Sequence, residues 1–440
     1  MLMNALSTDL YQLTMMAGYF HKKVLDARAT FELFVRRLPA HRNVLVSAGL
    51  EQALTYLEQL RFSADEITWL RDHPAFAQVP APFFEYLRAF RFSGDVWAMP
   101  EGTPLFPMEP ILRVSAPIAE AQLVETALLA IINFQTTVAS KALRIVRAAA
   151  GHSVMEFGAR RAHGLDAALL AARAAYLAGC DATSFVEAGR AFGIPLTGTM
   201  AHSWILAAPT ELDAFSSYAE LFGQHAALLL DTFDVDAATK AIVESPLRPQ
   251  GVRIDSGDLA AGSRSVRNRL DRAGLTTTRI IVSGDLDEWR IAALVAAGAP
   301  IDTFAVGTTL VTSDDAPALG GVYKLVEIED AGVVRPVMKR SEGKGTWPGR
   351  KQVWRVFADG LAVRDVIALN DEPGPPGAEP LLTLVMRQGV RTALPRSLEE
   401  SRRDCRRMTD AVPASLLALE QADAYPVQPS EALAVSLRGS

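Results

Sequence analysis

The tetrapeptide Ser-Gly-Asp-Leu occurs twice in the chain, at residues 256–259 and 283–286. Each copy follows a short apolar run and precedes a segment in which apolar residues recur with helical spacing. Apolar runs that alternate with helices in this way predict βα units and a parallel sheet. Other runs, near 153–157, 194–196 and 302–306, also end in small or polar residues. The repeated unit therefore predicts an α/β core in which at least six strand ends carry polar turns.

Two architectures place such turns where a ligand can bind. A βα barrel gathers all the carboxyl ends of its strands on one rim, whereas an open sheet binds ligands mainly at its switch point. Because so many successive turns are polar, we favour an irregular, TIM-like α/β barrel over residues 118–330. Residues 1–117 predict an α+β domain of their own, since short strands there are punctuated by glycine and proline. We expect residues 331–440 to pack on that N-terminal domain, so that both chain ends form the second domain.

Composition excludes several classes of protein. The net charge of −6 gives no basic surface for nucleic acid. Two cysteines, Cys180 and Cys405, cannot form a disulfide framework or a zinc ribbon, which fits a reduced compartment. The first residues lack the pattern of a signal peptide, and no apolar run reaches the roughly 18 residues of a membrane span. We therefore expect a cytoplasmic protein without nucleic-acid or membrane partners.

The segment 251–259 shows what one of these strand ends offers. Side chains alternate along an extended segment, so Arg253 and Asp255 are expected on the same face. A structural ion pair, followed by Asp258 as a helix N-cap, is the simpler interpretation. A ligand site is the other, because small residues between a strand and a helix leave backbone N–H groups that bind anions. The recurrence of the unit favours the ligand site.

The predicted rim combines cations, carboxylates and glycine turns. They are Arg160, Arg161, Arg253, Asp181, Asp255, Asp258, Asp285, Gly257, Gly284 and Gly307. This mixture suits a phosphate or diphosphate held partly through Mg²⁺, and hence phosphoryl or phosphoribosyl chemistry. His202 is the one histidine of seven that falls on a strand end. It could be a nucleophile, a general base, a phosphate carrier or simply a structural group.

Six segments, taken in chain order, resemble motifs of the nicotinate phosphoribosyltransferase family. They are Thr-Asp-Leu-Tyr-Gln-Leu-Thr-Met at 8–15, Glu-Phe-Gly-x-Arg-Arg at 156–161, Gly-Thr-x-Ala-His-Ser at 198–203, Gly-Val-Arg-Ile-Asp-Ser-Gly-Asp-Leu at 251–259, Val-Gly-Thr at 306–308 and Leu-Gly-Gly-Val-Tyr-Lys-Leu at 319–325. The resemblance implies a type II phosphoribosyltransferase fold. It also implies formation of nicotinate mononucleotide and diphosphate from nicotinate and phosphoribosyl diphosphate in NAD biosynthesis. ATP hydrolysis would be coupled to this step, Mg²⁺ would assist, and the protein would be a homodimer.

The same resemblance implies a role for each matching residue. Tyr11 and Phe157 would stack on the pyridine ring, which suits a flat heteroaromatic. The remaining nicotinate contacts would be Thr199, Arg253 and Asp181, and the phosphoribosyl diphosphate contacts would be Arg160, Gly284, Asp285, Gly307, Thr308 and, more weakly, Lys324. His202 would be phosphorylated by ATP, and Asp255 would reach Mg²⁺ through water. The expected catalytic residues are His202, Asp255 and Arg160.

Three alternatives stay open at this point. The same fold could transfer the phosphoribosyl group to nicotinamide or quinolinate, although the Arg160–Arg161 pair favours nicotinate. A non-catalytic barrel that binds phosphosugars would also keep these turns. An aldolase-like barrel would need a lysine at a strand end, and none of the predicted strand ends has one.

Overall fold

The structure is a computed structural model that describes residues 4–339 and 345–439. The chain divides into two compact units. One comprises residues 1–137 and 318–440, and the other comprises residues 138–317. The long helix α6 (Glu125–Ala148) begins in the first unit and ends in the second. None of the helices in the described ranges is both long and apolar enough to cross a membrane.

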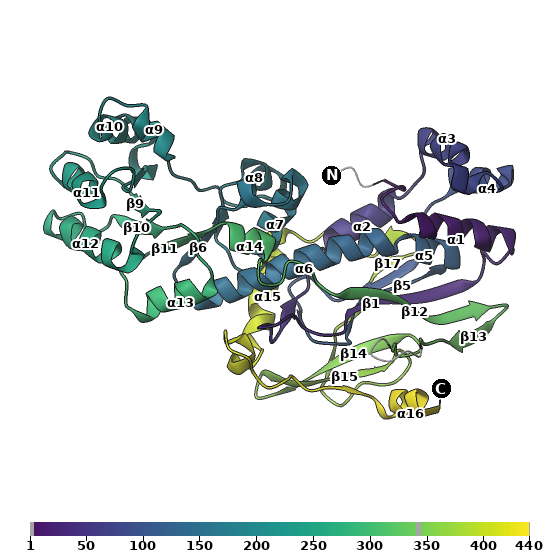
Figure 1. The fold of residues 1–440 in the computed structure, drawn as a ribbon. Coiled ribbons are helices and arrows are strands. Elements are labelled where there is room, and N and C mark those ends of the chain that lie inside the picture. Colours follow the sequence, from purple (N-terminus) through teal and green to yellow (C-terminus); the bar gives the residue numbers. More distant parts are fainter. Residues whose placement is uncertain (1–3, 340–344, 440) are drawn as a thin grey trace. The chain divides into compact units, whose positions relative to one another are not determined.

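The unit of residues 138–317 is built on a parallel sheet of six strands in the order β7-β6-β11-β10-β9-β8 (Figure 1). The strands are β6 (Ser153–Glu156), β7 (Ala182–Thr183), β8 (Ala227–Leu229), β9 (Gly251–Ile254), β10 (Arg279–Val282) and β11 (Thr303–Val306). The described strands leave β7 and β8 as two separate edges, so the sheet is a curled half-barrel. The predicted α/β core is therefore confirmed in this irregular form.

Helices connect these strands, and aspartates begin three of them. The described helices are α7 (Leu165–Leu177), α8 (Val186–Phe192), α9 (His202–Leu206), α10 (Glu211–Phe222), α11 (Val235–Val243), α12 (Leu259–Arg272), α13 (Glu288–Ala296) and α14 (Thr308–Thr312), with 3-10 turns at Ala159–Arg161 and Gly223–His225. The side chains of Asp234, Asp258 and Asp287 accept hydrogen bonds from the first free amides of α11, α12 and α13. The predicted N-cap at Asp258 is thus confirmed.

The other unit is an α+β structure made from both ends of the chain. Its largest sheet has the order β13-β12-β1-β5-β3-β17-β18, and smaller sheets have the orders β16-β14-β15-β19 and β2-β4. The strands are β1 (Arg28–Val35), β2 (Leu45–Val46), β3 (Asp95–Ala98), β4 (Pro104–Leu105), β5 (Pro110–Pro117), β12 (Gly321–Asp330), β13 (Val333–Pro336), β14 (Lys351–Ala358), β15 (Leu361–Leu369), β16 (Glu379–Pro380), β17 (Thr383–Arg387), β18 (Val390–Arg391) and β19 (Val427–Pro429). The described helices are α1 (Leu10–His21), α2 (Leu50–Gln59), α3 (Ala64–Asp72), α4 (Ala81–Ala89), α5 (Ile118–Leu123), α15 (Leu398–Asp410) and α16 (Glu431–Gly439), with 3-10 turns at Pro74–Phe76 and Ala414–Leu417.

Strand pairing explains why the late segment joins the early one. Strand β12 pairs antiparallel with β1 along its length, from Arg28 opposite Glu329 to Val35 opposite Gly321. Strand β17 pairs with β3 in the same sheet. Every residue of β1 is buried except Arg28, because apolar side chains of the unit's large core cover the sheet. The late strands therefore complete a sheet that the N-terminal residues alone would leave with open edges.

Candidate active site

A pocket of about 540 Å³ lies at the carboxyl ends of the half-barrel strands. Eleven of the residues predicted from the sequence line it: Phe157, Arg160, Arg161, Thr199, His202, Arg253, Asp255, Gly284, Asp285, Gly307 and Thr308. They lie in or after β6, β9, β10 and β11, or at the start of α9 and in the segment that leads into it. The carboxyl ends of parallel strands meet on one side of a sheet, which is why segments far apart in the chain converge here.

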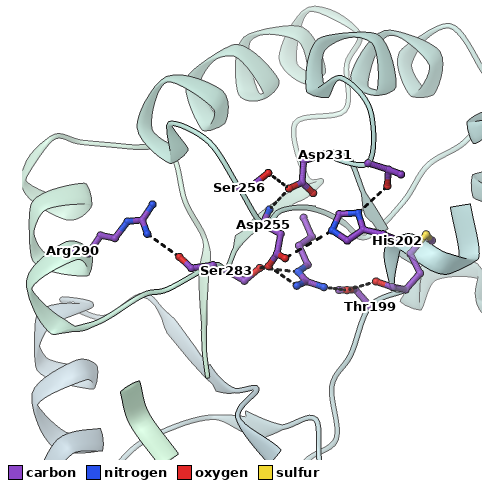
Figure 2. Close-up of polar contacts among 11 residues, drawn as sticks. Thr199, His202, Asp231, Asp255, Ser256, Ser283 and Arg290 are labelled. Carbon is purple, nitrogen blue, oxygen red and sulfur yellow. Dashed lines mark hydrogen bonds and ion pairs between the residues drawn. The ribbon is translucent and has the colours of Figure 1, made fainter. Parts of the chain in front are cut away.

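Arg253 lines this pocket and is the centre of a polar network whose other members, Thr199, Asp255 and Ser283, are labelled in Figure 2. Its Nη2 lies 2.6 Å from Oδ1 of Asp255, two residues further along the chain. Its Nε donates to the hydroxyl of Ser283 at 2.8 Å, and its Nη1 donates to that of Thr199 at 3.0 Å. The predicted placement of Arg253 and Asp255 on one face is confirmed. The guanidinium is held in a fixed orientation from three directions.

Asp255 stays ionised in this setting. Burial alone would raise the pKa of its carboxyl group. The hydrogen bond from Ser283, the charge of Arg253 and the nearby ring of His202 outweigh burial, so the pKa of Asp255 lies below its usual value. Near neutral pH the carboxylate is therefore an anchor for Arg253 and a hydrogen-bond acceptor, not a proton donor.

His202 begins α9 and faces the same carboxylate. Its Nδ1 lies 3.1 Å from the hydroxyl of Thr232, and its Nε2 lies 3.9 Å from Oδ2 of Asp255 (Figure 2). The side chain is 42% exposed, so the ring is open to a ligand in the pocket. Because Thr232 engages Nδ1, Nε2 is the nitrogen available for chemistry.

Asp231 is a functional candidate that sequence reasoning missed. It follows the three-residue strand β8, and its Oδ2 accepts hydrogen bonds from the amide of Asp255 at 3.2 Å and from the hydroxyl of Ser256 at 2.5 Å. Its Oδ1 is buried and has no hydrogen-bond partner among the described residues. The apolar run 227–230 followed by Asp-Thr was a usable signal.

Close packing fixes the turns that carry the predicted phosphate contacts. Gly284 has φ +93°, and a Cβ there would lie 2.0 Å from the carbonyl oxygen of Asp255. Arg290 donates to the carbonyl of Gly284 at 2.9 Å, which holds the turn from the other side. At Gly158 a Cβ would lie 2.3 Å from Val311 and 2.8 Å from the carbonyl oxygen of Gly307. Both positions therefore require glycine for steric reasons.

Asp181 is not among the residues that line the pocket. Its carboxylate accepts hydrogen bonds from the hydroxyl of Ser153 at 2.8 Å and from the amide of Val154 at 3.1 Å. These residues are at the amino end of β6, opposite the end that carries Phe157. The physical reason is that Asp181 precedes β7 instead of following a strand. The sequence pattern predicted that Asp181 follows a strand, whereas the structure places it directly before one.

Tyr11 and Lys324 belong to the other unit, where both lie near Glu125. The Tyr11 hydroxyl is 3.4 Å from Oε2 of Glu125, and the Lys324 ammonium is 3.6 Å from Oε1. Gln12 donates to the same carboxylate at 2.8 Å. Tyr11 is 49% exposed, so its ring is available to a ligand or a second chain. Burial, Glu125 and Asp9 raise the pKa of its hydroxyl, which stays protonated near neutral pH.

Comparison with known families covers both units. A profile for the nicotinate phosphoribosyltransferase N-terminal domain matches residues 6–133, and a profile for the nicotinate phosphoribosyltransferase family matches residues 152–361. Together these matches cover well over half of the chain.

Individual relatives agree with the profiles. The chain is 44% identical to a nicotinate phosphoribosyltransferase of Mycobacterium tuberculosis over 436 residues, which cover 97% of this chain and 92% of that protein. It is 45% identical to the nicotinate phosphoribosyltransferase of Bacillus subtilis over 379 residues, which cover 84% and 76%. The crystal structure of human nicotinic acid phosphoribosyltransferase superposes with a TM-score of 0.84 at 29% identity, covering 98% of this chain and 99% of that one.

Proposed function

Because the chain belongs to the nicotinate phosphoribosyltransferase family, we propose that its half-barrel pocket holds nicotinate beside phosphoribosyl diphosphate and joins them. The chain is an enzyme of NAD biosynthesis with nicotinate phosphoribosyltransferase activity. We assign this activity to the pocket because one cavity brings together Phe157, Arg160, His202 and Arg253. A cavity of about 540 Å³ is in the usual range for small-molecule sites.

Nicotinate would be recognised through its carboxylate and its ring. The hydrogen bonds to Asp255, Ser283 and Thr199 use three of the five N–H groups of Arg253. Two N–H groups are left for the substrate carboxylate. The ring of Phe157 lies 6.0 Å from the same guanidinium, so a flat ring bound against Phe157 would bring its carboxylate to Arg253. Tyr11 remains a predicted nicotinate contact on the basis of the family resemblance, whereas Asp181, bound to Ser153 and Val154 at the other end of β6, does not.

The transfer itself needs alignment more than covalent catalysis. The pyridine nitrogen lone pair forms a bond to C1 of the ribose while the bond from C1 to the diphosphate oxygen breaks. Arg160 is proposed to stabilise the charge on the departing diphosphate. The turns at Gly284, Asp285, Gly307 and Thr308 are proposed to hold the 5-phosphate, with Lys324 as a further phosphate contact.

The donor atoms present suit Mg²⁺ better than a tightly ligated metal. The described residues contain no group of three or more histidine, cysteine, aspartate or glutamate side chains able to hold an ion. Two aspartates adjoin here: ionised Asp255, whose backbone amide donates to Asp231 at 3.2 Å, and Asp231, whose Oδ1 is buried without a hydrogen-bond partner in the described part of the chain. Mg²⁺ usually takes one or two carboxylates and keeps several waters and substrate oxygens. We propose that these two residues hold it, Asp255 through water, and that bound Mg²⁺ would neutralise diphosphate charge.

ATP is proposed as a co-substrate that phosphorylates His202. In the tautomer whose Nδ1–H donates to Thr232, Nε2 keeps the lone pair that attacks the γ-phosphorus, and ADP leaves. The phosphoryl group adds about −1.5 to −2 charges beside Asp255. Added charge at this point would reorder the cations of the pocket and change affinity for phosphoribosyl diphosphate. Hydrolysis of the phosphohistidine then returns the site to its first state.

Substrate choice and ATP coupling can be tested together. We propose that the protein acts as a homodimer and that turnover with nicotinate greatly exceeds turnover with nicotinamide or quinolinate. The assay would follow each mononucleotide by mass spectrometry after mixing one base with phosphoribosyl diphosphate, with and without ATP. Nicotinate mononucleotide as the main product, formed faster with ATP, supports the proposal. Equal turnover of nicotinamide, or no product at all, contradicts it.

A further inference from the structure

The buried carboxylate of Glu156 joins two of the loops that line the pocket, and the chemistry proposed above does not use it. Glu156 is the last residue of β6 and is only 1% exposed. Its Oε1 accepts a short hydrogen bond from the amide of Gly158. Its Oε2 accepts a hydrogen bond from the hydroxyl of Thr183 at 2.5 Å. Among the described residues no cation is paired with this carboxylate, so hydrogen bonds alone satisfy it.

The first loop is the turn after β6. Its beginning is fixed because the amide of Phe157 donates to the carbonyl of Val306 at 2.7 Å. The carbonyl of Gly158 accepts from the amide of Arg161 at 2.7 Å, which closes the turn around Arg160. The contact from Glu156 to the amide of Gly158 therefore sets where this turn leaves the strand.

The second loop is the turn after β7. The hydroxyl of Thr183 accepts from the amide of Phe185 at 3.0 Å, and the amide of Ser184 donates to the carbonyl of Glu156 at 2.9 Å. Ser184 lines the pocket together with Phe157 and Arg160. One glutamate thus ties both loops, through its side chain and through its main chain.

We propose that Glu156 is a positioning residue for the transfer reaction. Its carboxylate fixes the turn that carries Phe157 and Arg160 relative to Ser184, so that the ring contact and the diphosphate contact are aligned before substrates bind. This inference rests on the proposed function, because it acts through the diphosphate contact of Arg160.

The ionised form of Glu156 is the one that performs this role. Both of its partners donate to the carboxylate, whereas a protonated acid would keep both contacts only if the hydroxyl of Thr183 turned to accept. Burial raises the pKa of the Glu156 carboxyl group above its usual value, and the hydrogen bonds from Thr183 and Gly158 offset only part of that rise.

Glu156→Gln is the variant that tests the inference. Glutamine keeps the shape and can accept from Gly158, but its NH2 group can only donate, so the hydroxyl of Thr183 would have to stop donating and accept a second hydrogen bond besides the one from Phe185. We expect kcat/KM for phosphoribosyl diphosphate to fall about tenfold, the size of one lost hydrogen bond to a charged group. We expect the thermal midpoint to change little. Glu109→Gln, a buried glutamate in the other unit, is the matched control and should leave kcat/KM unchanged.

A double-mutant cycle separates positioning from general stability. If Glu156 acts through Arg160, then Glu156→Gln should change kcat/KM less than about twofold in the Arg160→Ala background. Thr183→Val, which removes the hydroxyl, should reproduce the loss, and Thr183→Ser, which keeps it, should restore activity. These two variants also provide the test if Glu156→Gln does not fold.

Two results would overturn the inference, and they can be told apart. If Arg160→Ala reduces kcat/KM but Glu156→Gln and Thr183→Val lower only the thermal midpoint, then Glu156 is purely structural. If Arg160→Ala itself leaves kcat/KM unchanged, the proposed diphosphate contact is wrong, and the inference falls with that premise.

Discussion

Replacing Gly284 by alanine tests whether the glycine turns set the geometry of the reaction. A Cβ at this position would lie 2.0 Å from the carbonyl oxygen of Asp255, whereas ordinary contact begins near 3.4 Å. The two loops must therefore separate by about 1.4 Å, and the backbone must also hold φ +93° with a side chain, at a cost of about 1–2 kcal/mol. A displacement of about 1 Å in a positioned group can cost roughly a hundredfold in rate. We expect kcat/KM for phosphoribosyl diphosphate to fall about a hundredfold.

The chain provides a matched control in the other copy of Ser-Gly-Asp-Leu. Gly257 has φ +79°, but nothing lies within 4 Å of a Cβ built there. Gly257→Ala therefore carries the backbone strain without the steric overlap, and we expect kcat/KM to fall only a few-fold. Steady-state kinetics with nicotinate saturating and phosphoribosyl diphosphate varied would measure both variants. Equal losses for Gly284→Ala and Gly257→Ala would refute the steric argument.

Three further predictions follow from other parts of the structure. His202→Ala should abolish stimulation by ATP and the phosphohistidine signal in intact-protein mass spectrometry; persistence of either would exclude this residue as the phosphate carrier. Arg253→Lys should raise KM for nicotinate about 10- to 100-fold, because an ammonium cannot hold Asp255, Ser283 and Thr199 and also pair with a carboxylate; an unchanged KM would place the carboxylate elsewhere. Burial and the neighbouring Asp365 raise the pKa of Glu109 well above its usual value, so the folded state holds this proton more tightly than the unfolded state does. The free energy of unfolding should therefore decrease as pH rises from the ordinary glutamate pKa to that raised value, and Glu109→Gln should remove the decrease in urea titrations across this range.

Local patterns predicted much of the half-barrel. Strand β10 is the apolar run before the second Ser-Gly-Asp-Leu, and α12 is the helix predicted after the first copy. The shared face of Arg253 and Asp255 followed from alternation alone, because β9 is a regular strand. The Asp258 cap followed from the position of a short acidic side chain before a helix. Such features depend on a few neighbouring residues, which is why sequence was sufficient for them.

Features that depend on the direction of a strand or on tertiary contacts could not be predicted from local sequence patterns. Asp181 has a strand-end pattern, but only the structure shows that it precedes β7. Asp231 follows a strand of three residues, too short to give a periodic signal between helices. The roles assigned to individual residues, and the boundaries at 117 and 330 given to the three segments, stay predictions. Closure of the sheet was also not predictable, because it depends on how far the edge strands extend.

A crystal structure with nicotinate mononucleotide and diphosphate bound would test the central claim most directly. We predict that the 5-phosphate lies on the turns at Gly284 and Gly307, that the carboxylate contacts Arg253, and that diphosphate contacts Arg160. Density for the mononucleotide outside this half-barrel pocket, or in it with the carboxylate away from Arg253, would contradict the account.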